Sequence, residues 1–253
     1  MRCDVADRAA CFDCAAAIKA RFPNTPISYL AANAGFGTPG LLDSSEEELT
    51  RGMGVLFWGI IWVMQAFQEQ LLEQAPAPCA IVNTASVAGI MPGCGSYGVA
   101  KTATIAITES IYQEYLAKGA AHVKCHVLCP GLIMTNIMGE AEDLDEEVME
   151  SGDQRRIFGA AFATAMHEAA QSPAYLAQQV MDNIEDGGFY IVVDDPESPV
   201  NVNAINNWRA YMERQQAGEP PGGPGIGGKT AFGQFQQDLV KKVMAEVTEK
   251  ASL

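Results

Sequence analysis

The chain has 253 residues, of which 48% are hydrophobic and 19% charged, a composition that predicts one folded domain with a sizeable core. Its net charge of −15 opposes attraction to nucleic-acid phosphates and anionic lipids, so we exclude nucleic-acid and membrane-surface partners. The longest apolar run, residues 52–67, is shorter than the roughly 20 residues of a membrane span. No basic and then apolar leader opens the chain, so the sequence predicts a cytoplasmic protein without a membrane span.

The sequence alternates helix and strand patterns, which predicts a doubly wound α/β fold with a parallel sheet covered on both faces. Ser45 and Glu48 form a capping box at the start of one helix, and Gly119 stands where another should end. The predicted strands are residues 27–32, 80–84, 123–128 and 189–193, and the predicted helices are residues 9–22, 45–73, 97–118 and 172–184.

The last third of the chain changes in character. The acidic stretch of residues 139–153 has no clear core pattern and is a candidate mobile lid. We expect one domain over residues 1–215, a linker rich in proline and glycine over residues 216–230, and a carboxy-terminal amphipathic helix over residues 231–253. This helix would dock on the body of the domain or on a second subunit.

Seven cysteines, an odd number, do not predict a disulfide framework. Cys11 and Cys14 form a C-x-x-C pair on a predicted helix, and without a second such pair we interpret them as ordinary helix residues rather than a redox or zinc site. Four His and Cys residues between positions 122 and 129 alternate along a predicted strand, so their side chains point to opposite faces. We expect no metal site.

Three polar residues carry the candidate chemistry. Tyr97 and Lys101 are four apart and share one helix face, so the ammonium can lie near the phenol. A nearby positive charge lowers the pKa of a tyrosine and makes it a usable acid or base. Ser86, after the preceding strand, could hydrogen-bond a substrate oxygen beside that phenol. Since a Y-x-x-x-K pair also arises by chance as a surface tyrosine with a solvated lysine, the interpretation as a hydride-transfer site depends on further motifs.

These further motifs are present in order, and together the chain resembles the classical short-chain dehydrogenases over residues 2–195. Asp4-Val5 resembles the family's adenine-contacting pair, Ala32-Asn33-Ala34-Gly35 its Asn-Asn-Ala-Gly, and Pro130-Gly131-Leu132-Ile133-Met134-Thr135 its Pro-Gly-x-x-x-Thr. The resemblance implies that Ser86, Tyr97 and Lys101 are the catalytic residues. It implies that Asp4, Val5, Asn33, Ala34, Gly35, Tyr97, Lys101, Pro130, Gly131, Ile133 and Thr135 hold NAD or NADP.

The activity that the resemblance implies is hydride transfer between NAD(P) and a ketone or secondary alcohol, with Tyr97 exchanging a proton with the substrate oxygen. Lys101 would also hold the nicotinamide ribose. Family members usually pair through the helices that correspond to residues 45–73 and 97–118, so we expect a homo-oligomer or a larger assembly. The identity of the substrate and the choice between NAD and NADP stay open.

Three departures from the family pattern leave an alternative open. The Gly-rich turn after the first strand has no counterpart, so we expect a sheet short of about two strands at the amino-terminal side, with impaired dinucleotide binding. Leu56 stands where the family has a catalytic asparagine. Ten residues separate Ser86 from Tyr97, two fewer than is usual, which makes Thr84 a fallback for the serine. The alternative is a degenerate, non-catalytic relative that serves as a structural or assembly subunit.

Overall fold

The computed structural model describes residues 1–38, 40–42, 44–90, 94–137, 160 and 170–193. At its centre lies a parallel sheet whose strands follow one another in the order β1-β2-β3-β4. The predicted parallel α/β architecture is therefore confirmed. The strands are β1 (Tyr29–Ala32), β2 (Cys79–Thr84), β3 (Val123–Cys129) and β4 (Tyr190–Val192).

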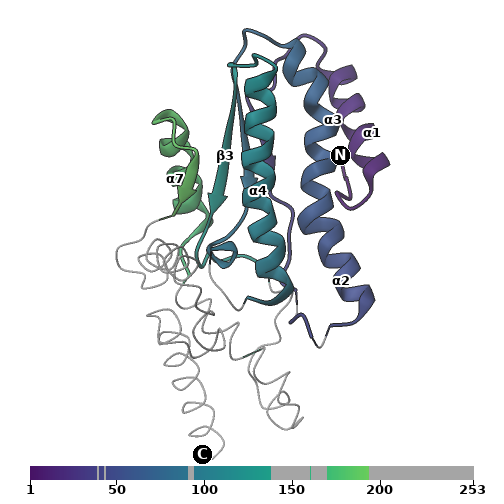
Figure 1. Cartoon of the computed structure of the whole chain (residues 1–253). Helices are drawn as coiled ribbons and strands as arrows, with labels where there is room; N and C mark the ends of the chain where they lie inside the picture. The colour runs from purple at the N-terminus through teal and green to yellow at the C-terminus, as the bar shows by residue number, and fades with distance from the viewer. Residues whose placement is uncertain (39, 43, 91–93, 138–159, 161–169, 194–253) are drawn as a thin grey trace, which may run out of the picture.

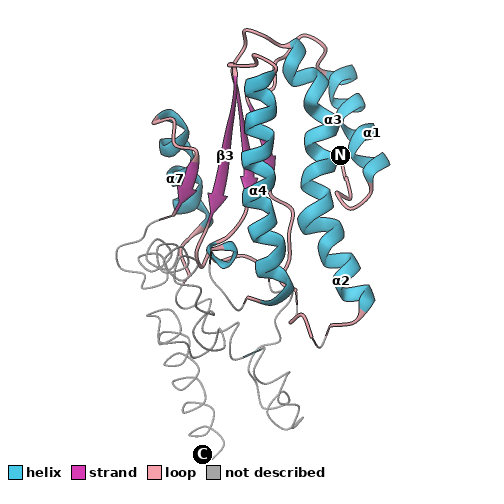
Figure 2. Ribbon diagram, in the orientation of Figure 1, coloured by secondary structure: helices cyan, strands magenta, loops and turns pink. Residues whose placement is uncertain are grey.

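Helices cover both faces of the sheet, as Figures 1 and 2 show. On one face, buried side chains of β2 and β3 pack against three helices in a single core cluster that includes Ala15, Leu71 and Tyr115. On the other face, Val82 and Leu128 pack under the fourth helix. These helices are α1 (Arg8–Arg21), α3 (Gly59–Glu73), α4 (Gly95–Ala117) and α7 (Pro173–Glu185).

Local capping interactions start and end the helices where the sequence predicts. Ser45 and Glu48 form the reciprocal capping box of α2 (Glu46–Met53), which satisfies two backbone donors that the first turn leaves free. Ser172 accepts the N–H of Tyr175 at the start of α7. Beyond the end of α4, Gly119 has φ of 68°, a conformation that favours glycine.

The predicted helix over residues 45–73 is interrupted, because a π-helical segment (Gly54–Trp58) joins α2 to α3. The N–H of Gly59 reaches back to the carbonyl of Gly54, five residues earlier. Val5 packs directly on this segment, and a Cβ at position 59 would lie 2.8 Å from Val5 Cγ2. The pattern of apolar residues contains no signal for a single-turn π bulge, which often marks a functional site.

The helical stretch Glu46–Glu73, which includes the π-helical segment, is long and apolar enough to cross a membrane by length and composition alone. Its buried residues Ile60, Met64, Phe67 and Leu71 belong to the hydrophobic core between the helices and the sheet. That packing is the arrangement of a core helix in a globular fold.

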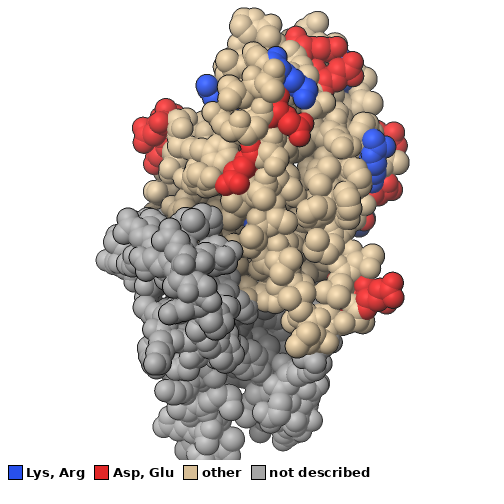
Figure 3. All heavy atoms as spheres, in the orientation of Figure 1, with Lys and Arg blue, Asp and Glu red and all other residues tan. Residues whose placement is uncertain are grey.

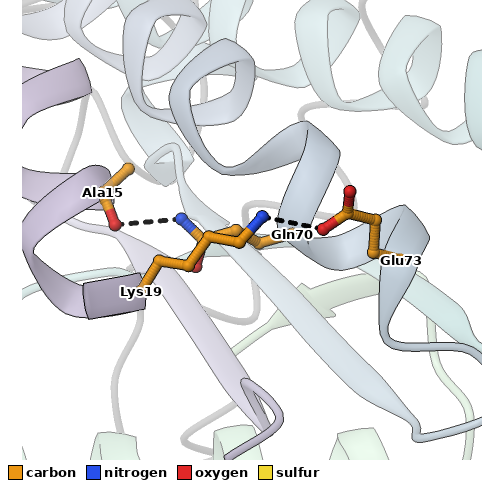
Figure 4. A network of polar contacts seen from close by, with 4 residues as sticks. All are labelled: Ala15, Lys19, Gln70 and Glu73. Carbon is orange, nitrogen blue, oxygen red and sulfur yellow. Dashed lines mark hydrogen bonds and ion pairs between the residues drawn. The ribbon is translucent and has the colours of Figure 1, made fainter. Parts of the chain in front are cut away.

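Helix α1 lies against α3 through one half-buried and one exposed polar contact (Figure 4). The Gln70 side chain donates to the carbonyl of Ala15 at 2.9 Å. Lys19 and Glu73 form an ion pair of 2.8 Å, and the hydrogen bond with Glu73 raises the pKa of Lys19. Because both side chains of this pair are exposed, it contributes little to stability compared with the apolar contacts around Ala15.

The predicted lid at residues 139–153, the linker at residues 216–230 and the helix at residues 231–253 all lie outside the described residues and stay predictions.

Candidate active site

Ser86 lies just beyond the carboxyl end of β2, where it caps a short 3-10 helix (Val87–Gly89). Its hydroxyl accepts the N–H of Ala88 at 3.1 Å, and its side chain is 8% exposed. The N–H of Val87 donates to the carbonyl of Pro130 at 3.0 Å, which ties the loop after β2 to the loop after β3. The position of the serine is thus fixed from two neighbouring strand ends.

The 3-10 helix approaches α4 so closely that only glycine fits at position 89. A Cβ there would lie 2.7 Å from the carbonyl carbon of Lys101, and the Thr102 hydroxyl donates to the carbonyl of Gly89 at 2.7 Å. This close approach brings the start of α4 beside Ser86. The Ser86 hydroxyl, and not that of Thr84, acts on the pKa of Tyr97 and lowers it.

The Lys101 ammonium is buried and lies over the ring of Tyr97. The lysine is 3% exposed, its Nζ donates to the carbonyl of Thr84 at 2.7 Å, and Nζ lies 5.5 Å from the centroid of the Tyr97 ring. Burial disfavours the charged form and lowers the pKa of Lys101 to about 8. The lysine is still mostly protonated at neutral pH, so it places a positive charge at the end of β2.

The prediction that Lys101 lowers the pKa of Tyr97 is wrong for the structure described. Burial of the phenol raises the pKa of Tyr97, and the hydrogen bond with Ser86 opposes this rise only in part. The ammonium of Lys101 lies over the ring and bonds to Thr84. Tyr97 is consequently a protonated phenol at neutral pH, in a state to donate a proton.

The segment Asn33-Ala34-Gly35, predicted to bind cofactor, lies beside the buried ammonium. Asn33 accepts a hydrogen bond from the Thr84 hydroxyl at 2.9 Å. A Cβ at Gly35 would lie 3.7 Å from the Lys101 ammonium and 3.1 Å from Leu56. All three residues of the segment are exposed. The exposed backbone of residues 33–35, next to the buried Lys101 ammonium, fits a ligand that carries hydroxyl groups, such as a ribose.

The segment Pro130–Thr135 follows β3 and borders the same site. The Pro130 carbonyl lies 3.5 Å from the Ser86 hydroxyl, and Ile133 forms a bridge with Gln171. The Thr135 hydroxyl is exposed, with a long contact of 3.4 Å to the carbonyl of Ile133. Half-buried Gly131 lies between these residues, so this loop could lie along a ligand held by Ser86 and Tyr97.

Asp4 and Val5 lie farther along the π-helical segment. The Asp4 carboxylate accepts the N–H of Ala6 at 3.0 Å, and Val5 contacts Gly59, three residues after Leu56. The structure therefore brings this pair to the helix that carries Leu56, while Ser86, Tyr97 and Lys101 form the compact centre.

Comparison with known proteins decides the family. The family model for the short chain dehydrogenase matches residues 1–146. The chain belongs to the short-chain dehydrogenase family. Its parallel α/β fold is the Rossmann-like fold of these oxidoreductases.

Two curated relatives of this short-chain dehydrogenase come from Xanthobacter autotrophicus. The chain is 32% identical over 129 residues to inactive 2-(S)-hydroxypropyl-CoM dehydrogenase 2, covering 49% of the chain and 54% of that relative. It is 31% identical over 196 residues to 2-(R)-hydroxypropyl-CoM dehydrogenase, covering 72% of the chain and 75% of that relative. The chain thus spans about half the length of the first relative and three quarters of the second.

Among solved structures, a short chain dehydrogenase from Burkholderia phymatum in complex with NAD superposes with a TM-score of 0.70 and 25% identity, over 88% of the chain and 78% of its own. An alcohol dehydrogenase from Thermococcus sibiricus, complexed with 5-hydroxy-NADP, superposes with a TM-score of 0.55 at 20% identity, over 73% of the chain and 67% of its own.

Two further residues of this short-chain dehydrogenase border the site: Cys129, which carries no sequence signal, and Leu56, which stands where the family has an asparagine. Burial raises the pKa of the Cys129 thiol to about 12, and the neighbouring backbone of Ser86 and the Lys101 ammonium oppose this rise. Leu56 is 1% exposed, with its Cδ2 facing Gly35. The position where the family has an asparagine is therefore occupied by a core side chain.

Proposed function

We propose that the chain is an NAD(P)-dependent oxidoreductase that interconverts a ketone and a secondary alcohol, with Tyr97 as the acid and base. The observation that carries the proposal is the convergence of Tyr97 and buried Lys101, whose Nζ lies 5.5 Å from the centroid of the Tyr97 ring, with the Ser86 hydroxyl close enough to the phenol to lower its pKa. Two adjacent hydroxyls can both bond one substrate oxygen, and the lysine supplies a positive charge beside them.

In the direction of ketone reduction, Tyr97 donates its proton to the substrate oxygen as negative charge develops there. The raised pKa of Tyr97 keeps this proton in place at neutral pH. Ser86 donates a second hydrogen bond and fixes the oxygen. When bound, the nicotinamide supplies the hydride.

Three groups at the strand ends would hold the cofactor. The backbone of Gly35 and the Lys101 ammonium, which a Cβ at position 35 would approach to 3.7 Å, suit the hydroxyls of the nicotinamide ribose. The loop from Pro130 to Thr135 would hold the carboxamide and phosphate side. Asp4 and Val5 would contact the adenine. The relatives solved with NAD and with 5-hydroxy-NADP support NAD(P) as the cofactor class.

The test combines cofactor binding with turnover by one protein preparation. Titration of the purified chain with NADH and NADPH, followed by nicotinamide fluorescence, measures binding. Oxidation of the bound cofactor in the presence of a panel of ketones measures turnover at 340 nm. We expect turnover that Tyr97→Phe abolishes and Tyr112→Phe, on an exposed position of the same helix, preserves. Equal rates in the two variants would contradict the proposed role of Tyr97.

A second candidate function is that of a non-catalytic subunit. It is favoured by buried Leu56, because a leucine cannot hold the water of the family's proton relay. One relative, from Xanthobacter autotrophicus, is named inactive, which supports this candidate. Saturable NADH binding without turnover of any ketone would support this candidate.

We also propose that two copies pair through α3 and α4. The exposed large apolar side chains on this part of the chain include Trp58, Val99 and Leu116, at 45%, 51% and 57% exposure. The space-filling view shows an area without charged side chains over the lower part of these helices, whereas acidic and basic side chains lie over their upper ends (Figure 3). Burial of such an area against a second copy stabilises the pair.

Light scattering tests the pairing. We expect a mass of twice 27.0 kDa for the wild-type chain and a shift toward the monomer in Trp58→Lys. Lysine there would place a charge in the interface, whereas Tyr29→Lys, on exposed β1, is a matched control that should stay dimeric. A wild-type mass of one chain at micromolar concentration would refute the pairing.

A further inference from the structure

The helix that carries Tyr97 begins without the local cap that starts other helices of the fold. The side chains of Asp7, Ser45 and Ser172 accept backbone N–H groups at the starts of α1, α2 and α7. Cys94 precedes α4, and its side chain forms no such hydrogen bond with the residues that the structure describes. The position of the first turn of α4, which places Tyr97, is therefore not fixed by a local cap.

Thr38 contacts this first turn from a distant part of the chain. It lies in the loop after β1, close behind Gly35, and its hydroxyl is hydrogen-bonded to that of Ser96 at 2.8 Å. Ser96 is 7% exposed and directly precedes Tyr97. A hydrogen bond between side chains 58 residues apart thus joins the segment beside Lys101 to the first turn of α4.

The loop that carries Thr38 is itself held on two further sides. The Thr38 methyl group packs against α2, where a Cβ at Gly52 would lie 2.9 Å from Thr38 Cγ2. The N–H of Gly37 donates to the carbonyl of Ile137 at 2.8 Å, in the segment after β3. Helix α2 and the first turn of α4 lie at the same end of the molecule (Figure 1). Thr38 is therefore a fixed point from which a hydrogen bond can locate Ser96.

We propose that Thr38 is a positioning residue whose hydroxyl holds the first turn of α4 through Ser96 and so keeps the Tyr97 phenol beside Ser86. The two groups on its Cβ have separate roles, because the methyl group packs on α2 and the hydroxyl bonds to α4. Without the hydroxyl, the first turn would lose a contact that no local cap replaces. The consequence for turnover rests on the proposed function, since the displaced turn slows the reaction only if Tyr97 transfers the proton.

Two substitutions of Thr38 separate the hydroxyl from the methyl group. Thr38→Val keeps the branched shape and removes the hydroxyl, whereas Thr38→Ser keeps the hydroxyl and removes the methyl group. Thr50→Val is the matched control, because Thr50 is an exposed threonine of α2. We expect only Thr38→Val to loosen the start of α4.

Amide hydrogen exchange of the full chain measures this loosening irrespective of turnover. Loss of one hydrogen bond shifts a local opening equilibrium about fivefold, so exchange at residues 98–101 should accelerate about fivefold in Thr38→Val. In Thr38→Ser and Thr50→Val it should stay within about twofold of the wild-type chain. Exchange at residues 176–185 of α7 should not change, which distinguishes a local effect from a general loss of stability.

Ketone reduction by the same variants measures the effect on the proposed reaction. We expect Thr38→Val to lower kcat at least about fivefold while the KM for the ketone changes less than about twofold, because the proton donor and not the binding surface is displaced. Thr38→Ser should retain the wild-type kcat. Ser96→Ala removes the other hydroxyl of the bond, so the double variant should lose no more kcat than the more affected single variant.

The two measurements separate this inference from the proposed function. Accelerated exchange in Thr38→Val would support the positioning role even if the wild-type chain reduced no ketone, a result that would count against the proposed activity alone. Equal exchange in Thr38→Val and Thr50→Val, or equal acceleration in Thr38→Val and Thr38→Ser, would overturn the positioning role of the hydroxyl. Ser96→Ala should show the same acceleration as Thr38→Val, so the test does not depend on the folding of one variant.

Discussion

Gly89 is the position where one added methyl group should separate the proposed catalytic residues. In Gly89→Ala, the new Cβ would lie 2.7 Å from the carbonyl carbon of Lys101 and 2.9 Å from the N–H nitrogen of Thr102. Both neighbours are helix backbone, which cannot rotate away, so the 3-10 helix itself must shift. The φ angle of Gly89 is not in the left-handed region, so its backbone conformation suits alanine. The destabilisation expected of Gly89→Ala is therefore steric alone. Overpacking of this kind costs about 1–3 kcal/mol.

This cost should appear in two measurements on the same protein. For a chain of this size about 2–4 °C of Tm is lost per kcal/mol, so thermal unfolding followed by circular dichroism should show a fall of about 2–12 °C. A displacement of Ser86 by about 1 Å from Tyr97 should lower kcat by about 10²-fold. The matched control is Gly40→Ala, whose Cβ meets no atom within 4 Å and should change Tm by less than about 2 °C. If Gly89→Ala matched this control in both Tm and kcat, the close approach would not position the site.

The other predictions concern the proton-transfer groups. Tyr97→Phe keeps the ring but removes the proton, so we expect kcat to fall about 10²- to 10⁴-fold while Tm stays near that of the wild type; a kcat within about twofold of wild type would contradict this. Ketone reduction should decline as the pH rises through about 8, because Lys101, whose pKa burial lowers to about 8, is charged below this pH and neutral above it. Steady-state rates between about pH 6 and 10 measure this decline, and a flat profile would show that the lysine charge is not needed.

The sequence predicted most of the fold because local signals and the global fold agree in this chain. The capping box at Ser45 and the glycine at position 119 mark helix boundaries, and runs of apolar residues such as residues 79–84 mark the strands. The separation of four residues between Tyr97 and Lys101 likewise predicts that both side chains lie on one helix face and reach the same strand end. Each of these features depends on residues close together in the chain.

What the sequence could not provide depends on contacts between distant segments. The π-helical turn before Gly59 accompanies the packing of Val5, more than fifty residues earlier. The pKa of Tyr97 depends on how deeply the fold buries the phenol, and burial outweighs the expected influence of Lys101. Spacing along the chain reports none of these contacts.

Substitution of Leu56 distinguishes most directly between the two candidate functions, an enzyme and a non-catalytic subunit. Its side chain is 1% exposed and faces Gly35, beside the Lys101 ammonium. An asparagine there would present an amide toward the lysine, where the family has its proton relay. Loss of the leucine from the core should cost about 2–5 kcal/mol of stability, so Leu56→Ala is the matched control for packing.

If the remaining site is catalytically competent, Leu56→Asn should turn over ketones at least about tenfold faster than Leu56→Ala, since a restored proton transfer is worth about 10² to 10⁴ in rate. Both variants should unfold at a lower temperature than the wild-type chain. Steady-state kcat at a saturating NADH concentration, measured below the Tm of both variants, makes the comparison. Equal rates for the two variants would show that position 56 no longer communicates with Lys101, as expected of a chain whose site has been kept for binding or assembly and not for turnover.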